Sequence, residues 1–193
     1  EHFYPAEFIH HLFFVLAMQL SAGCEELRDL LRFMVDDIKR APSLQGDKIL
    51  WVHLMPYYQQ SLKAAFDYSP AHQIIAVDMA FCTMSDLTDT DPFRALAKKL
   101  IGNAMNGPYE RKLALVDRLL DATHADGVIH FCHWGCKQSA GGSALLREHL
   151  HEAGVPLLQL DGDGIDERNS HDGQIKTRLE AFFEVLEAKR AES

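Results

Sequence analysis

The sequence has no excess of basic residues and no long apolar run, and each absence excludes a class of function. It contains 19 Lys and Arg against 28 Asp and Glu, a net charge of −9. A duplex nucleic-acid binder would need a clustered basic surface, whereas a small anionic ligand needs only local donors. The apolar stretch 8–20 is too short to span a bilayer, and it lacks the basic start and cleavage site of a signal peptide. We therefore expect a cytoplasmic protein with neither nucleic-acid nor membrane partners.

The chain also lacks an initiating methionine, which leaves open that it is a fragment or a trimmed chain. Cysteine is scarce and forms no Cys-x-x-Cys pair, and a cytoplasmic α/β protein does not normally oxidise its thiols to disulfides. Neither a Gly-x-Gly-x-x-Gly fingerprint nor a P-loop is present. The loop that begins at Asp161 is a poor calcium loop, because Ile165 occupies a ligand position and Asp166 replaces the glycine. The four thiols remain as buried side chains or metal ligands: Cys24, Cys82, Cys132 and Cys136.

What the chain does contain is an ordinary globular composition, with 47% hydrophobic and 24% charged residues. Residues 5–40 have a helical pattern that is broken at Gly23. From about residue 48 onward, apolar β-prone segments alternate with helical ones. The predicted strands are 49–54, 74–77, 128–133 and 156–160, and the predicted helices after the arm are 57–66, 91–101, 109–124, 139–152 and a last one that ends near 188.

This alternation predicts an α/β fold. Strands separated by helices form a parallel sheet with right-handed crossovers. We expect a flavodoxin-like sheet of about four strands in the order 2-1-3-4, flanked by helices. Residues 1–44 are predicted to be a helical arm, or a linker from an N-terminal domain that is missing here. Residues 45–193 are predicted to be the flavodoxin-like α/β domain.

Because all strands are parallel, the loops that follow them gather at one edge of the sheet, which we call the rim, where α/β proteins bind ligands. The segment 126–142 contributes a buried strand and then a loop with a thiol, an indole, an ammonium and an amide. The predicted rim residues are His53, Met55, Pro56, Tyr57, Tyr58, Asp78, Phe81, Cys82, Thr83, His133, Trp134, Cys136, Lys137, Gln138, Asp161, Asp163, Asp166, Arg168, Gln174 and Arg178.

Cys136 is the strongest candidate for chemistry at the rim. It follows Gly135, precedes a predicted helix and has Lys137 beside it. The positive end of the helix and the ammonium both stabilise a thiolate, which suits a nucleophile or a metal ligand. Gly141 and Gly142 would let a bulky inorganic group approach the backbone closely.

Other roles for the thiols are less favoured. Cys132 lies within a strand and is predicted to be a packed thiol in a helix layer, and Cys24 is predicted to be a helix residue. Zinc bound through Cys132, His133 and Cys136 is disfavoured, because adjacent strand residues point to opposite faces. A thiol-nucleophile enzyme is a distant alternative, since His133 is near Cys136 in the sequence.

Three motifs give the chain a family resemblance that runs from about Lys48 onward. The segments 130–138, 160–166 and 173–182 resemble the C-terminal half of the 2-hydroxyacyl-CoA dehydratase component D and benzoyl-CoA reductase family. The His-Trp-Gly-Cys-Lys-Gln form at 133–138 is most similar to its double-cubane-cluster branch. The segment 78–83, which ends in Cys-Thr, resembles an acidic segment of the same family.

The resemblance implies an oxygen-sensitive iron–sulfur protein, with a [4Fe–4S] or double-cubane cluster, that pairs with a homologous subunit in a homo- or heterodimer. A separate ATP-hydrolysing activator would deliver low-potential electrons for one-electron chemistry on an acyl-CoA or another small reducible substrate. By position, Cys136 matches a cluster ligand and Cys82 matches a second one. Candidate catalytic or substrate groups, by location alone, are His133, Lys137, Gln138, Ser139, Arg168 and Arg178.

One departure from the family pattern matters. A further cluster cysteine would come from an N-terminal domain, and two thiolates hold a four-iron cluster poorly. Either the chain is a piece of a longer protein, or Cys24 substitutes, or the cluster is lost. The hypotheses are therefore a redox enzyme subunit, a double-cubane-type reductase of small molecules, and a non-catalytic α/β assembly module without a cluster.

Overall fold

Alternation of apolar side chains within the strands gives the sheet two buried faces. In the first strand, Ile49 and Trp51 point to one face while Leu50 and Val52 point to the other, and all four are completely buried. The computed structural model describes residues 6–21, 23–43, 45–82 and 89–192. Its strands are β1 (Asp47–Val52), β2 (His72–Val77), β3 (Gly127–His133) and β4 (Leu157–Gly162).

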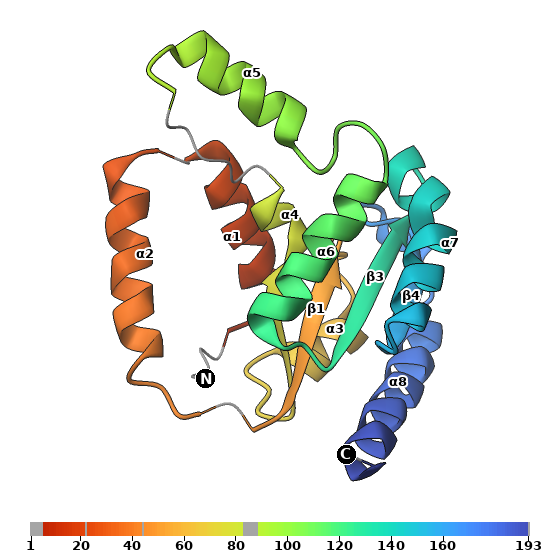
Figure 1. Ribbon diagram of the computed structural model, residues 1–193. Coiled ribbons are helices and arrows are strands. Elements are labelled where there is room, and N and C mark those ends of the chain that lie inside the picture. Colours follow the sequence, from red (N-terminus) through yellow and green to blue (C-terminus); the bar gives the residue numbers. More distant parts are fainter. Residues whose placement is uncertain (1–5, 22, 44, 83–88, 193) are drawn as a thin grey trace.

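All three strand pairings are parallel, and the order is β2-β1-β3-β4 (Figure 1). The predicted flavodoxin-like order is therefore confirmed. The register pairs Val52 of β1 with His130 of β3, and Cys132 of β3 with Asp161 of β4. Because the strands run the same way, the loops that follow them share one edge, so the rim exists as expected.

Helices cover both faces of the sheet. The α3 (Gln60–Phe66) and α8 (Asp172–Glu192) helices pack on the face of Trp51, together with α1 (Phe8–Leu20). The α6 (Glu110–Thr123) and α7 (Lys137–Glu152) helices pack on the face of Leu50. The other helical elements are α2 (Glu25–Ile38), α4 (Asp78–Phe81), α5 (Pro92–Gly102) and the 3-10 turn η1 (Glu167–Asn169).

The structure differs from the predicted elements where side chains of other segments bond to the backbone. β1 ends at Val52 rather than at residue 54, because the His53 N–H donates to the Asp78 carboxylate and the His53 backbone turns to a φ of +77°. The short helix α4 was not predicted. Thr83, which was assigned to the rim, lies outside the described residues.

The N-terminal helices differ in how closely they join the body of the fold. Phe8 of α1 is fully buried and packs edge-to-face on Trp51, with ring centroids 5.4 Å apart. α2 stands farther out, on the other side of α1 from the central strands (Figure 1). The division into an arm (1–44) and a domain (45–193) stays a prediction. No helix in the described part of the chain is both long and apolar enough to cross a bilayer.

Candidate functional site

Cys136 lies at the start of α7, where the sequence predicts a reactive thiol. Its Sγ accepts a hydrogen bond from the Ser139 backbone N–H at 3.5 Å, so the thiol caps the helix. The side chain is partly exposed, and α7 is 16 residues long. A helix N-terminus and a backbone N–H both favour negative charge on sulfur. Cys136 is therefore an accessible thiol at the N-terminus of a long helix.

The residue before Cys136 packs closely against His133. A Cβ on Gly135 would lie 3.0 Å from Nε2 of His133, which is closer than side chains normally approach. His133 in turn accepts a hydrogen bond from the Gly164 N–H through Nδ1, at 3.1 Å, and lies 3.9 Å from the Asp163 carboxylate. Thus His133 ties the loop after β3 to the loop after β4, and it remains partly exposed at the rim.

The other candidate catalytic residues separate into exposed and buried ones. Lys137 is exposed, and Gln138 is partly exposed, with a long 3.5 Å hydrogen bond to the Ala104 carbonyl. Ser139 is only 2% exposed, and its hydroxyl donates to the Phe131 carbonyl at 3.2 Å. A substrate at the rim can reach Lys137 and Gln138, whereas Ser139 acts inside the protein.

Cys82, the second predicted ligand, caps the C-terminal end of α4 and is buried. Its thiol donates a hydrogen bond to the Met79 carbonyl at 3.2 Å. Burial raises the pKa of this thiol, and the nearby Asp78 carboxylate raises it further. As a metal ligand, Cys82 would have to lose its proton and this hydrogen bond. That it shares a metal group with Cys136 stays a prediction.

Cys132 is buried, 6% exposed, in agreement with the prediction of a packed thiol. Burial raises its pKa, and the Asp161 carboxylate on the neighbouring strand has the same effect. Cys24 caps the start of α2, where its Sγ accepts from the Leu27 N–H at 3.4 Å, and it is exposed. No group of three or more His, Cys, Asp or Glu side chains suited to a metal ion occurs within residues 6–21, 23–43, 45–82 and 89–192.

The expectation that Gly142 leaves room for an inorganic group is wrong. A side chain at Gly142 would overlap the ring of Tyr109, which fills that space. The position is glycine because two helices meet there, Tyr109 being the residue before α6. Gly141, by contrast, has open space around it, so the expectation stays a prediction at that residue.

The two arginines predicted at the rim are both engaged with protein groups. Arg168 is exposed and bonds to the Asp166 carboxylate through Nε at 2.9 Å and Nη2 at 2.6 Å. This contact and the Arg168 backbone N–H hold the pKa of Asp166 below its usual range. Arg178 donates to the Gln159 carbonyl and lies 3.6 Å from Asp161. Arg168 is thus at the rim, while Arg178 braces α8 against β4.

Sequence reasoning missed a buried polar cluster that lies behind the rim on the α6 side. Lys112 is 2% exposed and forms an ion pair with Asp78, which has no exposed surface. Asp78 also accepts the His53 N–H at 2.7 Å. A signal was available, because Lys112 shares the apolar face of its helix with Leu115 and Val116. A lysine on a buried face needs a buried carboxylate nearby.

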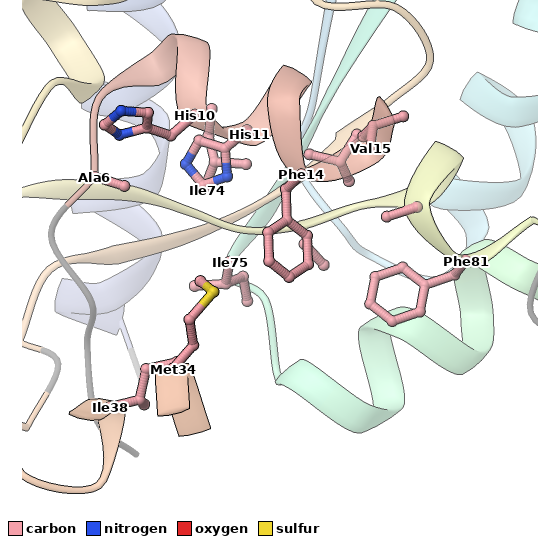
Figure 2. Close-up of a pocket in the computed structure, with 13 residues that line it drawn as sticks. Ala6, His10, His11, Phe14, Val15, Met34, Ile38, Ile74, Ile75 and Phe81 are labelled. Carbon is pink, nitrogen blue, oxygen red and sulfur yellow. The ribbon is translucent and has the colours of Figure 1, made fainter. Parts of the chain in front are cut away.

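A second feature near Cys82 is an apolar cavity of about 300 Å³ between α1, α2, β2 and α4. Figure 2 shows Phe14 of α1, Met34 of α2 and Phe81 of α4 among its lining residues. His11 supplies one of the few polar groups, and burial lowers its pKa to about 4. The neutral imidazole and the aromatic rings give this cavity a mostly apolar lining. Cys82 follows Phe81 directly, so the cavity adjoins the helix that carries this thiol.

Comparison with known proteins decides the family. Residues 4–186 match the profile of the 2-hydroxyglutaryl-CoA dehydratase, D-component, family. The chain belongs to this family. The resemblance inferred from segments 130–138, 160–166 and 173–182 is therefore confirmed, while its placement in the double-cubane branch stays a prediction.

Individual relatives agree with the family assignment. The chain is 25% identical to the (R)-phenyllactyl-CoA dehydratase alpha subunit of Clostridium sporogenes over 191 residues, which are 93% of this chain and 46% of that one. It is 28% identical to a subunit of the benzoyl-CoA reductase of Thauera aromatica over 102 residues, 52% of this chain and 24% of the relative. A putative dehydratase subunit of Escherichia coli, YjiM, is 27% identical over 99 residues, 50% and 25% of the two chains. The chain thus spans less than half the length of these relatives.

Proposed function

We propose that this chain is the iron–sulfur part of a subunit of a cytoplasmic 2-hydroxyacyl-CoA dehydratase-like enzyme. The observation that supports it is the position of Cys136: a partly exposed thiol at the N-terminus of α7, with a backbone N–H aimed at its sulfur, in a member of the dehydratase D-component family. A bound cluster would supply low-potential one-electron chemistry. The electrons would come from an ATP-dependent activator, and the other ligands from a homologous subunit or from further residues of the protein.

The donor set fits this role in part. Cys136 offers an open thiolate, and Cys82 offers a second one once it gives up its bond to Met79. Four-iron clusters are held by more thiolates than these two. The proposal therefore requires ligands beyond the residues that the structure describes, in accordance with the length of the relatives.

The chain's own groups have defined tasks in this proposal. The Ser139 N–H and the dipole of α7 stabilise the Cys136 thiolate. The exposed Lys137 ammonium adds positive charge at the rim, where the acyl-CoA is bound, and Gln138 and His133 are the adjacent groups that can hydrogen-bond to it. The apolar cavity beside α4 receives the acyl group, in keeping with the aryl-acyl thioesters in the names of two relatives.

The experiment compares two cysteines with the same local geometry. Cys24 and Cys136 both cap a helix and both accept a backbone N–H at 3.4–3.5 Å, but only Cys136 lies at the rim. The full-length protein is reconstituted anaerobically with iron and sulfide. We expect Cys136→Ser to lose most of the iron and Cys24→Ser to keep it. Iron kept at the wild-type level in Cys136→Ser contradicts the assignment of Cys136, and iron lost in both variants means that Cys24 is a ligand as well.

A second candidate function is a non-catalytic assembly module that has lost the cluster. It is favoured by the finding that the described residues contain no group of three metal-binding side chains. Iron and sulfide analysis after strictly anaerobic purification separates the two. The module contains neither element and still binds its partner subunit, whereas the dehydratase subunit contains both. A double-cubane reductase contains twice the iron of a single cubane and reduces small molecules in place of dehydrating an acyl-CoA.

A further inference from the structure

Two histidine side chains are buried behind the rim, at the ends of neighbouring strands. His130 is 1% exposed and His53 is 8% exposed. The register of the sheet pairs His130 with Val52, the last residue of β1, and His53 follows Val52 directly. Burial is the main cause that lowers the pKa of each imidazole, His53 is near enough to His130 to lower the pKa of His130 further, and Lys112 lowers the pKa of both. They therefore form one buried pair.

The bonds of Ser139 fix which nitrogen of His130 carries the proton. The Ser139 hydroxyl donates to the Phe131 carbonyl, which can only accept. Its oxygen must then be the acceptor in the 3.1 Å contact with Nε2 of His130. Since burial lowers the pKa of His130 to about 4, the ring is neutral at pH 7 and has one N–H. That N–H is on Nε2, so Nδ1 presents a bare lone pair.

This lone pair is buried without a protein partner. Neither Nδ1 of His130 nor Nδ1 of His53 has a hydrogen-bond partner among the described residues. Leaving a buried polar atom unsatisfied is costly, so native interiors contain few such atoms. Buried waters typically make about three hydrogen bonds to polar groups of this kind. The Lys112 ammonium, which donates to Asp78, brings further N–H donors to the same cluster.

We propose that His53 and His130 enclose a binding site for an ordered water, and that this site makes His130 a positioning residue for Ser139. The water donates one O–H to Nδ1 of His130. Its second O–H and its oxygen form hydrogen bonds with Nδ1 of His53 and with the polar cluster of Asp78 and Lys112. With Nδ1 occupied, His130 keeps the tautomer that donates Nε2–H to Ser139.

The consequence for the rim rests on the proposed function of Cys136. Ser139 bonds to His130 and Phe131 with its side chain and to the Cys136 sulfur with its backbone N–H. Holding the hydroxyl therefore holds the N–H that points at the thiolate. Hydrogen bonds of this kind around a metal ligand typically change metal affinity 10- to 100-fold when they are removed. His130 would act on the metal site without touching it.

Two substitutions of His130 test the water site and the hydrogen bond to Ser139 independently. Asn places an amide near the position of Nδ1, and Gln places one near the position of Nε2. His130→Asn should keep the water and lose the bond to Ser139. His130→Gln should lose the water and keep that bond. The measurement is a crystal structure of the wild type and of both variants at a resolution that shows ordered waters.

The expected wild-type structure has a water within hydrogen-bonding distance of both Nδ1 atoms. A dry contact between the rings, or a water that stays in place in His130→Gln, overturns the site. In His130→Asn the Ser139 side chain should rotate. The distance between the Ser139 backbone N and the Cys136 sulfur should then exceed its present 3.5 Å. An unmoved Ser139 overturns the positioning role.

Nitrogen-15 NMR of the wild type checks the same proposal without any variant. His130 should carry its proton on Nε2, and a proton on Nδ1 contradicts it. Iron content then tests the link to the rim. Under reconstitution, His130→Asn should bind iron about 10- to 100-fold more weakly than His130→Gln. If the wild type itself binds no iron, the proposed function fails, while the water and the tautomer are still decided by the crystal and NMR data.

Discussion

The carboxylate of Asp78 and the ammonium of Lys112 form an ion pair in which neither side chain has more than 2% of its surface exposed. Asp78 begins α4, which leads to Cys82, and Lys112 lies on the buried face of α6. The pair, together with the His53 N–H, joins the ends of β1 and β2 to the helix layer. It therefore sets where Cys82 stands relative to the sheet.

Breaking this pair from one side should destabilise the fold strongly. Asp78→Asn or Lys112→Met alone leaves an uncompensated charge in the interior, and each should lower the free energy of unfolding by about 3–5 kcal/mol. The double variant removes both charges and should lose much less than the sum. Urea unfolding followed by circular dichroism measures all three. Strictly additive losses would show that the two groups do not interact.

Stability should fall on acidification because of buried histidines. Burial lowers the pKa values of His11, His53 and His130 from 6.5 to about 4. Between these values the unfolded chain binds protons that the folded chain does not. The stability that the fold has while these histidines are neutral is thus fully present above pH 6.5 and is lost as the pH falls toward 4. For one fully shifted histidine the loss is roughly 3 kcal/mol.

The check is the urea midpoint at several pH values between 7.5 and 4.5. His130→Gln should have a flatter pH dependence than the wild type. The control is His151→Gln, which removes an exposed imidazole from the end of α7. Wild type and His130→Gln curves that stay parallel over this range would exclude His130 as a source of the effect.

Alanine substitutions at two adjacent glycines of α7 should change the stability of the protein in opposite directions. A methyl group at Gly142 collides with the Tyr109 ring, so Gly142→Ala should lose about 1–3 kcal/mol through overpacking. Gly141 has open space and lies within the same helix, so Gly141→Ala should gain up to about 1 kcal/mol in helix propensity. Thermal unfolding midpoints of the two variants test this. A stabilising Gly142→Ala would mean that Tyr109 moves aside without cost.

Filling the apolar cavity should weaken binding of the acyl group. Met34 of α2 lines the cavity, so Met34→Trp should raise the Kd for an aryl-acyl-CoA thioester while leaving the Kd for free CoA unchanged. Phe33 is the preceding residue and is 64% exposed, so Phe33→Trp is the matched control. Isothermal titration calorimetry gives both constants. Unchanged thioester binding in Met34→Trp would move the acyl group to another part of the protein.

Local patterns in the sequence were enough to predict the sheet order and the place of Cys136. Strand–helix alternation determines a parallel sheet, and the loop that holds Cys136 follows a strand of which all residues but the last are buried. The same reasoning placed Cys132 in the interior, because strand residues alternate between faces. The positions of the strands and the face on which Cys132 lies depend on neighbours along the chain, which a sequence displays directly.

Only the tertiary structure shows which residues distant in the sequence contact one another. Asp78 and Lys112 are 34 residues apart, and Tyr109 lies 33 residues before the glycine that its ring covers. The tautomer of His130 depends on Ser139, which comes from the next helix. Hydrophobic periodicity determined which elements this protein forms and in what order. Side-chain packing between those elements decided which polar groups meet behind the rim, because burial makes each unpaired charge or lone pair costly and only the folded chain brings its partner near.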